Sequence, residues 1–574
     1  MRVSHSNGRI ARDGGTARRR RITCGVTALL ALGVFGTAVV AGPGTAGAAP
    51  GVNAALIVTT GHPIGGIAVS SGSFTATVAP AFSPTIHDYT INCPATASSV
   101  TFTMSTPAGT ISYKGQTGTQ VSATVSLVTN QAAVVRGTNP TASTAENYWF
   151  RCLPTDFPKL AVTTDTGQAP NGYYLTQNAI VAPGYGPYVM VLDKHGTPIW
   201  WQKSLNFAGT PGAAGWFQVW SPNVLGWDSA SNGGSPNFNN AAGYTLYNLS
   251  TSTSSTVVPN NAPADGHEIV HLSDGNILFL TDPEVTGVDL TAIGDGTNQN
   301  VADCAMQETT PTGQVLWSWD SLSHIGIDES VDPISDTVNG QKVWDIFHCN
   351  GVSLQGAASA NPETANIVLS SRENSSIYLI DRSTGNVIWK VGGNQPSTTD
   401  PDASAQFLTV QNDPEGGFFA QHNPTLTTAG ELTLFDDHSG APLYSDPHET
   451  PGPARGVQYK IDTTAGTATL DQSYVAPDNE SSLATGSYNR YSLPGGATDN
   501  VVGWGFDPSQ VNNGVTTTKL FSEVTGNGHV MLAVDFVDPT GGGLFGVNDS
   551  YRVIKVPTSD LSLTLLHQDM GGLR

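Results

Sequence analysis

One short pattern recurs along most of the chain and limits its fold more than any other feature: a strand, a turn and then Gly-x-x-apolar-Trp. The copies lie at residues 196–200, 313–317 and 385–389, with a degenerate one at 466–470. Repeats at intervals of this size are typical of solenoids and propellers. The region after residue 155 divides into roughly six units of about 70 residues, which suits one blade with its loops. We therefore predict an all-β fold with a six-bladed β-propeller over residues 156–574.

Two copies of the repeat extend far enough to indicate a complete hairpin. They span residues 188–200 (YVMVLDKHGTPIW) and 377–389 (IYLIDRSTGNVIW). Each has two apolar runs separated by a turn that contains glycine, which is the pattern of a β-hairpin. We expect both to be hairpins within blades.

The segment before the repeats, residues 55–155, has short alternating strands separated by turn residues, so we predict a small Ig-like β-sandwich there. The piece at residues 81–89 (AFSPTIHDY) resembles the opening of cadherin-like β-sandwich modules of bacterial surface proteins. It carries no evident chemistry, which favours an accessory or docking role. The predicted strands are residues 73–78, 88–93, 99–104, 109–114, 123–128 and 147–152.

The first 48 residues have the pattern of an export signal. Four arginines at 18–21 precede an apolar run at 22–41, and Ala46-Gly47-Ala48 provides the small residues of a cleavage site. We predict that residues 1–48 are a signal peptide and that the protein is secreted. The length of the apolar run leaves an uncleaved anchor as the alternative, and the choice between Sec and twin-arginine export stays open.

The charge of the chain excludes one class of partner. Only 12% of residues are charged, and the formal net charge is −22. Nucleic-acid binding needs Lys and Arg to displace counterions from phosphates, so nucleic acid is not an expected partner. The strong negative charge suits a soluble secreted protein that leaves the membrane once its signal is cleaved.

Four cysteines follow the predicted signal, an even number in an oxidising compartment where disulfides persist. We predict a Cys93–Cys152 bond, because both residues fall in the sandwich, and a Cys304–Cys349 bond from the remaining two. The alternative for Cys349 is a reactive thiol or a metal ligand, but no CxxC spacing supports it.

A second periodic feature places one kind of functional side chain repeatedly. Three histidines are each followed by a glycine eight residues later, and then by an apolar strand. We predict that each histidine opens a hairpin that turns at the glycine. The histidines are His267, His348 and His422, and the glycines are Gly275, Gly356 and Gly430.

The returning strand of each hairpin should end beside its histidine, because paired strands are antiparallel. That end carries Arg372 in the second copy, whereas Asp282 and Asp437 hold the corresponding positions in the other two. An arginine with three histidines at one mouth of a propeller channel would form a hydrogen-bond-donating, cationic cup. Such a cup suits a small oxyanion, and a sulfonate needs less charge neutralisation than a phosphate, so no metal cofactor is required.

Other interpretations of the histidines remain open at this point. They can be structural residues, or ligands of iron or copper in a propeller oxidoreductase, although Arg372 beside a metal cation costs Coulomb energy. A secreted propeller that binds a ligand without turnover is a further alternative. So is a sulfatase, in which water takes the sulfuryl group.

Several segments together resemble the bacterial arylsulfate sulfotransferase family, in ordered pieces over residues 156–560. The segments are HEIVHLSDGNIL from His267, WDIFHCN ending at Asn350, SSR ending at Arg372, and QH ending at His422. The resemblance implies a six-bladed propeller enzyme that moves a sulfuryl group from an aryl sulfate donor to a phenolic acceptor. It also implies that no nucleotide sulfate donor or other cofactor takes part.

The resemblance implies roles for individual residues as well. His422 would accept the sulfuryl group transiently, and His267, His348 and Arg372 would hold the sulfonate oxygens. His267 or His348 would also act as the base for the acceptor phenol. Asn350 belongs to the site motif and, with the aromatic residues Phe347 and Trp504, is a candidate for substrate binding; a place in the core is the alternative for the two aromatic residues. The sequence departs from the family pattern at Cys349 and Asn423.

Overall fold

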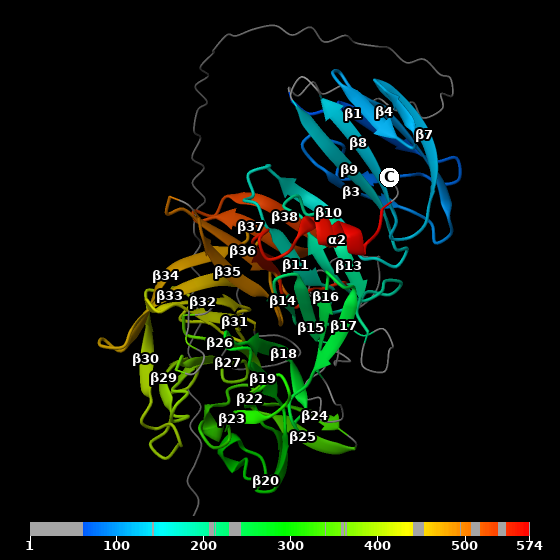
Figure 1. Ribbon diagram of the computed structural model, residues 1–574. Coiled ribbons are helices and arrows are strands. Elements are labelled where there is room, and N and C mark those ends of the chain that lie inside the picture. The colour runs from blue at the N-terminus through cyan, green and yellow to red at the C-terminus, as the bar shows by residue number, and fades with distance from the viewer. Residues whose placement is uncertain are drawn as a thin grey trace, which may run out of the picture. The chain divides into compact units, whose positions relative to one another are not determined.

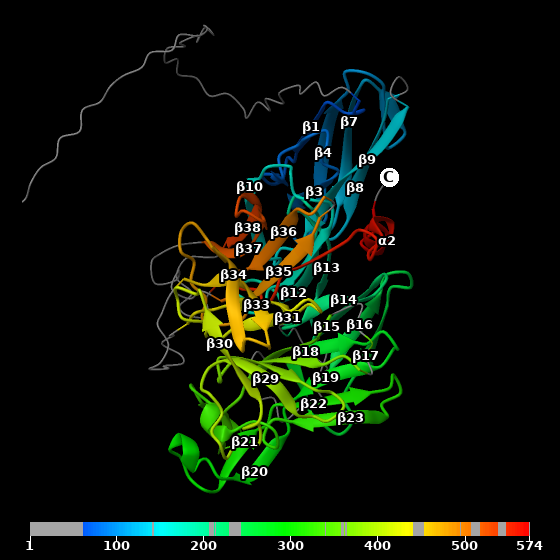
Figure 2. The ribbon, with the colours of Figure 1, turned by 90° about the vertical axis from the view of Figure 1, so that its left-hand side faces the viewer.

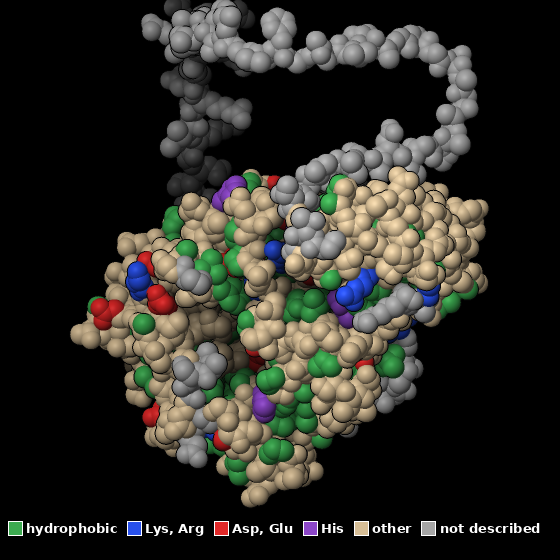
Figure 3. Space-filling model, turned by 45° about the horizontal axis from the view of Figure 1, so that its top comes forward, with side chains coloured by type: hydrophobic (Ala, Val, Ile, Leu, Met, Phe, Trp, Pro, Cys, Tyr) green, Lys and Arg blue, Asp and Glu red, His purple; other side chains and the backbone are tan. Residues whose placement is uncertain are grey.

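The computed structural model describes residues 61–139, 143–205, 212, 214–228, 243–338, 340–356, 361, 364–439, 453–493, 495–506, 517–537 and 547–572. These residues form an almost entirely β structure (Figure 1). The predicted signal peptide, residues 1–48, lies outside them. None of their helices is long and apolar enough to span a membrane. The face in Figure 3 carries few charged side chains, in line with the composition.

Residues 66–153 form two sheets that share one hydrophobic cluster. The three-stranded sheet, in the order β1-β4-β7, consists of β1 (Gly66–Ser70), β4 (Ser98–Ser105) and β7 (Gln120–Leu127). The six-stranded sheet, in the order β2-β3-β9-β8-β5-β6, consists of β2 (Val78–Ala79), β3 (Asp88–Asn92), β9 (Thr144–Leu153), β8 (Ala132–Asn139), β5 (Thr110–Tyr113) and β6 (Gln116–Gly118). Tyr89 stacks on Phe150 with ring centroids 4.7 Å apart, and Phe102 meets Phe150 edge-on. The predicted Cys93–Cys152 disulfide is present.

Five of the six strands predicted in this segment are present, but the prediction for residues 73–78 is wrong. Only Val78 of that segment lies in a strand. The reason is a side chain that replaces the backbone ladder: Asn92 accepts from the Thr77 N–H through Oδ1 and donates to the Thr75 carbonyl through Nδ2. Polar side chains that bond the backbone in this way compete with regular pairing.

Most strands beyond residue 158 pair antiparallel, and successive sheets such as β14–β17 and β18–β23 lie side by side in both views (Figures 1 and 2). One sheet consists of β11 (Tyr173–Gln177), β12 (Tyr188–Leu192), β13 (Pro198–Lys203) and β39 (Ile554–Val556). A second consists of β14 (Phe217–Ser221), β15 (Val224–Asp228), β16 (Tyr244–Asn248) and β17 (Thr253–Val257). A third consists of β18 (Ala264–His271), β19 (Ile277–Thr281), β22 (Ala305–Thr309) and β23 (Val315–Asp320). A fourth consists of β35 (Ser487–Ser492), β36 (Thr498–Gly503), β37 (Thr517–Thr525), β38 (Val530–Val537) and β10 (Lys159–Asp165).

A nine-stranded sheet contains two further antiparallel groups of four. They are β26 (Cys349–Leu354), β27 (Ile367–Ser371), β28 (Ser376–Ile380) and β29 (Val387–Gly392), and β31 (His422–Leu426), β32 (Glu431–Asp436), β33 (Arg455–Asp462) and β34 (Thr467–Val475). β30 (Gln406–Gln411) runs parallel to both β29 and β34 and joins the two groups. The end strands β26 and β31 also lie together, because the Asn350 amide donates to the Gln421 carbonyl at 2.7 Å.

The turn glycines of the sequence repeat have the positive φ angles that such turns favour in glycine. Gly196 joins β12 to β13 and Gly385 joins β28 to β29, which confirms both predicted hairpins. Gly313 lies between β22 and β23, and Gly466 lies between β33 and β34. The repeat therefore marks a turn between two adjacent antiparallel strands in four of these groups of strands.

A small sheet is inserted next to the β18–β23 sheet. It contains β20 (Glu284–Val288), β21 (Gln299–Ala302), β25 (Gln341–Asp345) and β24 (Ile334–Val338), with 3-10 helices η1 (Thr291–Ile293) and η2 (Ile327–Glu329) nearby in the chain. The second predicted disulfide, Cys304–Cys349, joins the segment before β22 to the first residue of β26. It therefore anchors the backbone immediately after His348.

The helix α2 (Leu563–Asp569) contacts the six-stranded sheet near the beginning of the chain. His567 Nε2 lies 2.7 Å from Asp88 Oδ1, and its ring stacks on Trp149 with centroids 4.1 Å apart. Arg151 donates to the carbonyls of Met570 and Gly571 at 2.8 and 2.7 Å. A polar and aromatic contact thus joins segments more than 400 residues apart in sequence.

Candidate active site

Each predicted histidine stands at the start of a hairpin or in its first strand. His267 lies in β18, His348 directly precedes β26, and His422 is the first residue of β31. These strands pair with β19, β27 and β32, and the turns between them contain Gly275, Gly356 and Gly430 with φ of 90°, 85° and 82°. The hairpin prediction is confirmed for all three histidines.

The returning strands end beside the histidines, as antiparallel pairing requires. Arg372 directly follows β27, and its backbone N–H donates to the His348 carbonyl at 3.0 Å. Asp282 and Asp437 directly follow β19 and β32 at the equivalent positions. Neither Arg372 nor His422 faces solvent, since the exposed fractions are 4% and 2%.

Aromatic ring contacts bring the three hairpins together. The rings of His267 and His348 meet edge-on with centroids 5.0 Å apart. The ring of Tyr551 lies 5.7 Å from that of His267 and 6.2 Å from that of His422. Tyr551 therefore links the His267–His348 pair to His422, and histidines separated by up to 155 positions share one site.

The tautomer of His422 follows from its two hydrogen bonds. Nδ1 lies 2.6 Å from Asp437 Oδ2, and the backbone N–H of Thr485 donates to Nε2 at 3.1 Å. A nitrogen that accepts a hydrogen bond carries no hydrogen, so the ring hydrogen is on Nδ1 and the lone pair is on Nε2. Burial lowers the pKa of His422 well below its usual value, and Arg372, His267, His348 and Arg552 lower it further. His422 is therefore a neutral imidazole, and its Nε2 lone pair has the Thr485 backbone N–H as its partner.

Aspartates orient the other two histidines as well. Asp345 accepts from the backbone N–H of His348 at 2.9 Å and lies 2.7 Å from its Nδ1, and Asp265 pairs with Nδ1 of His267. Burial lowers the pKa of His348, but Asp345 and Glu373 outweigh burial and hold the pKa above its usual value. In both rings Nε2 is the nitrogen that is left to face a substrate.

Arg372 is held by protein groups on two sides. One terminal nitrogen donates to Glu373 at 2.8 Å, and the other donates to the Leu483 carbonyl at 3.2 Å. Burial raises the pKa of Glu373 to about 7, although Arg372 and His348 oppose the shift. The guanidinium is thus fixed near His422, beside a buried carboxyl group that pairs with it.

A second buried guanidinium, absent from the sequence prediction, lies at the same site. Arg552 donates to Glu268 Oε2 at 2.6 Å and to the Asn350 carbonyl at 3.2 Å. Tyr551 donates to the same carbonyl at 3.0 Å. The predicted cationic cup therefore contains two arginines. Each arginine pairs with a carboxylate, Arg372 with Glu373 and Arg552 with Glu268, and these pairs reduce the net positive charge of the site.

The structure brings only part of the predicted binding set to the histidines. Asn350 is buried between β26 and β31, where its side chain holds the strand that carries His422. Phe347 belongs to a hydrophobic cluster with Leu280, Met306 and Leu369. Trp504 packs among Phe435 and Tyr474 and donates from Nε1 to Ser522 Oγ at 3.0 Å. Both aromatic side chains are buried in hydrophobic clusters, which agrees with the alternative that the sequence left open for them, a place in the core.

Sequence reasoning missed most of the groups that orient the histidines. Asp345 stands three residues before His348 in the quoted motif, and Asp265 stands two residues before His267, so local spacing contained a signal for both. Thr485, Tyr551 and Arg552 had no local signal, because they reach the site from loops 63 or more positions away from the histidine or asparagine that they contact.

Potential metal ligands among the described residues gather elsewhere. The groups of three or more His, Cys, Asp or Glu with suitable spacing are His62 with His87 and Glu146, and Glu329 with Asp400 and Asp402. The three predicted catalytic histidines are in neither group. Each of the three pairs with an aspartate through Nδ1. Their ring nitrogens do not have the mutual spacing that the two groups above have.

The fold is nearly all β. The site contains three histidines, each paired with an aspartate at Nδ1, and two arginines close to the Nε2 lone pair of His422. A family model described as Arylsulfotransferase (ASST) matches residues 162–493, more than half of the chain. The chain belongs to this family, which confirms the resemblance found in its motifs. Membership implies a sulfotransferase that acts on small aryl sulfates and phenols.

Curated proteins contain no match to the chain. Among solved structures, a putative 6-phosphogluconolactonase from Bacteroides fragilis is 10% identical, with a TM-score of 0.29, over 74% of this chain and 93% of that one. An ulvan lyase of polysaccharide lyase family PL25 is 10% identical, with a TM-score of 0.30, over 72% of this chain and 98% of that one.

Proposed function

We propose that the protein is a secreted, nucleotide-independent aryl sulfotransferase that works through a sulfo-histidine at His422. Residues 1–48 are its signal peptide, residues 55–155 an accessory β-sandwich, and residues 156–574 a six-bladed propeller. Six antiparallel groups among the described residues, five of four strands and one of five, support the propeller, because each group suits one blade. The exchange of β10 and β39 between the first and last groups suits closure of a ring.

The observation that carries the proposal is the state of His422. Nδ1–H bonded to Asp437 leaves the Nε2 lone pair as the nucleophile, and the low pKa keeps that lone pair unprotonated at neutral pH. Here the partner of Nε2 is a single backbone N–H, that of Thr485, which a sulfonate oxygen can engage instead as sulfur approaches.

In the first step, Nε2 of His422 attacks the sulfur of the aryl sulfate and an N–S bond forms as the S–O bond to the aryl group breaks. The phenolate leaves with the bonding electrons. Arg372 and protonated His348 stabilise the sulfonate oxygens during transfer, because the pKa of His348 is raised. The transferring group carries a single negative charge, which one arginine and one imidazolium, each already paired with a carboxylate, can stabilise.

In the second step, an acceptor phenol loses its proton to a base, its oxygen attacks sulfur, and the N–S bond breaks to restore neutral His422. A phenol has a pKa near 10, so a base is needed at neutral pH. We assign that base to His267. Its side chain is the most exposed of the three, at 19% against 13% for His348 and 2% for His422, and Asp265 pairs with its Nδ1, which leaves Nε2 for the acceptor.

The test is turnover of a chromogenic aryl sulfate with and without a second phenol. We expect one equivalent of donor phenol per enzyme in a burst, then turnover only with acceptor, and a sulfuryl increment on the peptide containing His422. Steady release without acceptor would make the protein a sulfatase. Binding without a burst would make it a binding protein, and loss of activity with a chelator would favour the metal oxidoreductase.

The burst rate should stay level from about pH 6 to neutral pH and fall at alkaline pH. A lowered pKa means that His422 is protonated, and inactive, only well below its usual value of 6.5. A raised pKa means that His348 keeps its proton above that value. Stopped-flow measurement of the burst across pH checks this, and His348→Gln should remove the alkaline decline. A rate that rises with pH through 6.5 would contradict both assignments.

A further inference from the structure

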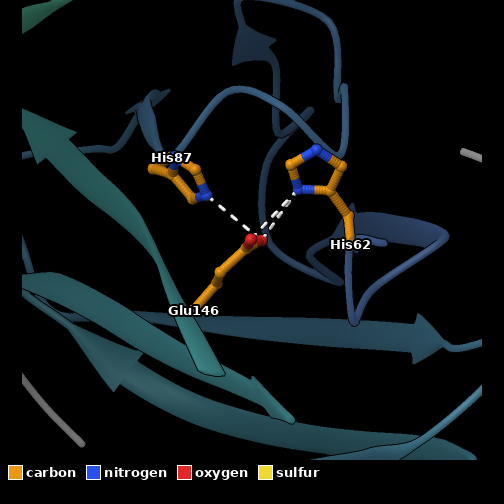
Figure 4. Close-up of side chains that lie close together, drawn as sticks. All are labelled: His62, His87 and Glu146. Carbon is orange, nitrogen blue, oxygen red and sulfur yellow. Dashed lines mark hydrogen bonds and ion pairs between the residues drawn. The ribbon is translucent and has the colours of Figure 1, made fainter. Parts of the chain in front are cut away.

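Three side chains outside the sulfuryl-transfer site converge on the six-stranded sheet (Figure 4). His62 lies in the segment before β1, His87 directly precedes β3, and Glu146 is in β9. Figure 4 shows both imidazole rings pointing at the carboxylate of Glu146 from separate segments. None of these residues belongs to the hairpins that carry the predicted catalytic histidines.

The distances between the three groups match the spacing of ligands around one metal ion. His62 Nδ1 lies 3.1 and 3.0 Å from the two Glu146 oxygens, and His87 Nε2 lies 3.3 Å from Oε2. All three ligand atoms lie within 4.8 Å of one another. Zinc ligands stand about 2.1 Å from the metal, so two of them at a tetrahedral angle are about 3.4 Å apart.

The contact between His62 and Glu146 is nearly symmetric. Nδ1 is almost equidistant from both carboxylate oxygens, which is the geometry of a three-centre hydrogen bond. It is also the geometry expected when the Nδ1 lone pair and both oxygens face one ion between them. The equal distances therefore suit a shared cation at least as well as a proton.

We propose that His62, His87 and Glu146 bind one divalent transition-metal ion, of which zinc is the type. Two imidazole nitrogens exclude magnesium and calcium, which prefer oxygen ligands, and a 2-His-1-carboxylate set suits Zn²⁺ and its first-row neighbours. Three protein ligands leave the fourth position to water or to an external ligand.

The surroundings are built for such a site. Tyr148 donates to Glu146 Oε2 at 2.7 Å and so orients the carboxylate. Ligands at metal sites are commonly oriented by such hydrogen bonds from residues that do not touch the metal. The side chains are partly exposed, at 29% for His62, 39% for His87 and 19% for Glu146, so an ion can enter. His87 and Glu146 also line a cavity of about 320 Å³ beside α2.

Metal binding would attach the segment before β1, through His62, to the six-stranded sheet that contains Glu146. His62 is 84 positions from Glu146 in sequence, and His87 is 59 positions from it. A metal that joins distant segments stabilises the folded chain because the set is not assembled in the unfolded one.

The experiment is calorimetric titration of ZnCl₂ into the EDTA-treated, dialysed full-length mature protein. We expect one zinc ion per chain in the wild type, and at least about 100-fold weaker binding in His62→Gln and in His87→Gln. The matched control is His195→Gln, because His195 Nδ1 pairs with Asp165 at 2.8 Å without a third ligand and should leave zinc affinity unchanged.

A cobalt-substituted wild type provides a readout that needs no variant. Its visible spectrum should show a four-coordinate site, and X-ray absorption of the zinc form should show two imidazoles with oxygen ligands at about 2.0–2.2 Å. Absence of zinc binding at micromolar metal would overturn the proposal. So would binding that survives in both histidine variants, or binding that His348→Gln abolishes.

Discussion

Replacing His422 with asparagine should lower kcat/KM for a chromogenic aryl sulfate by about 10⁴-fold and abolish the burst of phenol. Losing the nucleophile of a covalent mechanism removes the step that all later steps need, and measured losses at such positions have this size. The asparagine amide can still donate to Asp437, so the hydrogen bond that Nδ1 makes at 2.6 Å keeps a counterpart. Burst kinetics and intact-protein mass spectrometry measure the change.

The matched control for His422→Asn is His271→Asn. His271 is an exposed histidine of β18 whose Nδ1 donates to the Trp220 carbonyl at 2.8 Å, away from the site. It should keep full activity. Retention of the burst in His422→Asn, with a sulfuryl increment on another peptide, would move the nucleophile to a different side chain.

Replacing Asp437 with asparagine should reduce the burst rate by roughly 10³ to 10⁴-fold while the protein stays folded. The asparagine amide would donate to Nδ1, which forces the ring hydrogen onto Nε2, where it faces the Thr485 N–H. The nucleophilic lone pair is then lost in the ground state. The same exchange in a Ser-His-Asp triad has an effect of this magnitude by selecting the wrong tautomer.

Nitrogen NMR of the His422 ring separates this effect from a structural one, since a tautomer change exchanges the signals of the two nitrogens. Asp165→Asn is the control, because Asp165 pairs with His195 at 2.8 Å outside the site and should leave the burst unchanged. An Asp437→Asn protein with normal burst kinetics would show that Asp437 does not set the tautomer.

Local patterns predicted most of the strand hairpins and the three histidine positions. Gly196, Gly385 and Gly430 mark turns because a positive φ suits glycine, and the apolar runs on either side need no distant partner to be recognised. The pairing rule then places Arg372 beside His348, since an antiparallel strand returns to its own start. Sequence alone therefore places each residue within its own hairpin.

Contacts between hairpins were beyond the reach of the sequence. The ring of Tyr551 bridges His267 and His422 because segments nearly 300 residues apart meet at the site, and no local spacing encodes that meeting. The sequence left two environments open for Phe347 and Trp504, because an aromatic residue near a site motif in sequence can also point into the core, where both side chains lie. The strand predicted at residues 73–78 failed because the side chain of Asn92 replaced its ladder.

The strand β39 and the residues before it have a consequence for when the protein becomes active. β39 pairs with β11, and Tyr551 and Arg552 immediately upstream bond the Asn350 carbonyl. During synthesis, the hairpins that carry His267, His348 and His422 can form before Tyr551 and Arg552 are made, yet the cluster around the histidines lacks both contacts to the Asn350 carbonyl until then. The cluster is therefore complete only once the chain has been synthesised through residue 552.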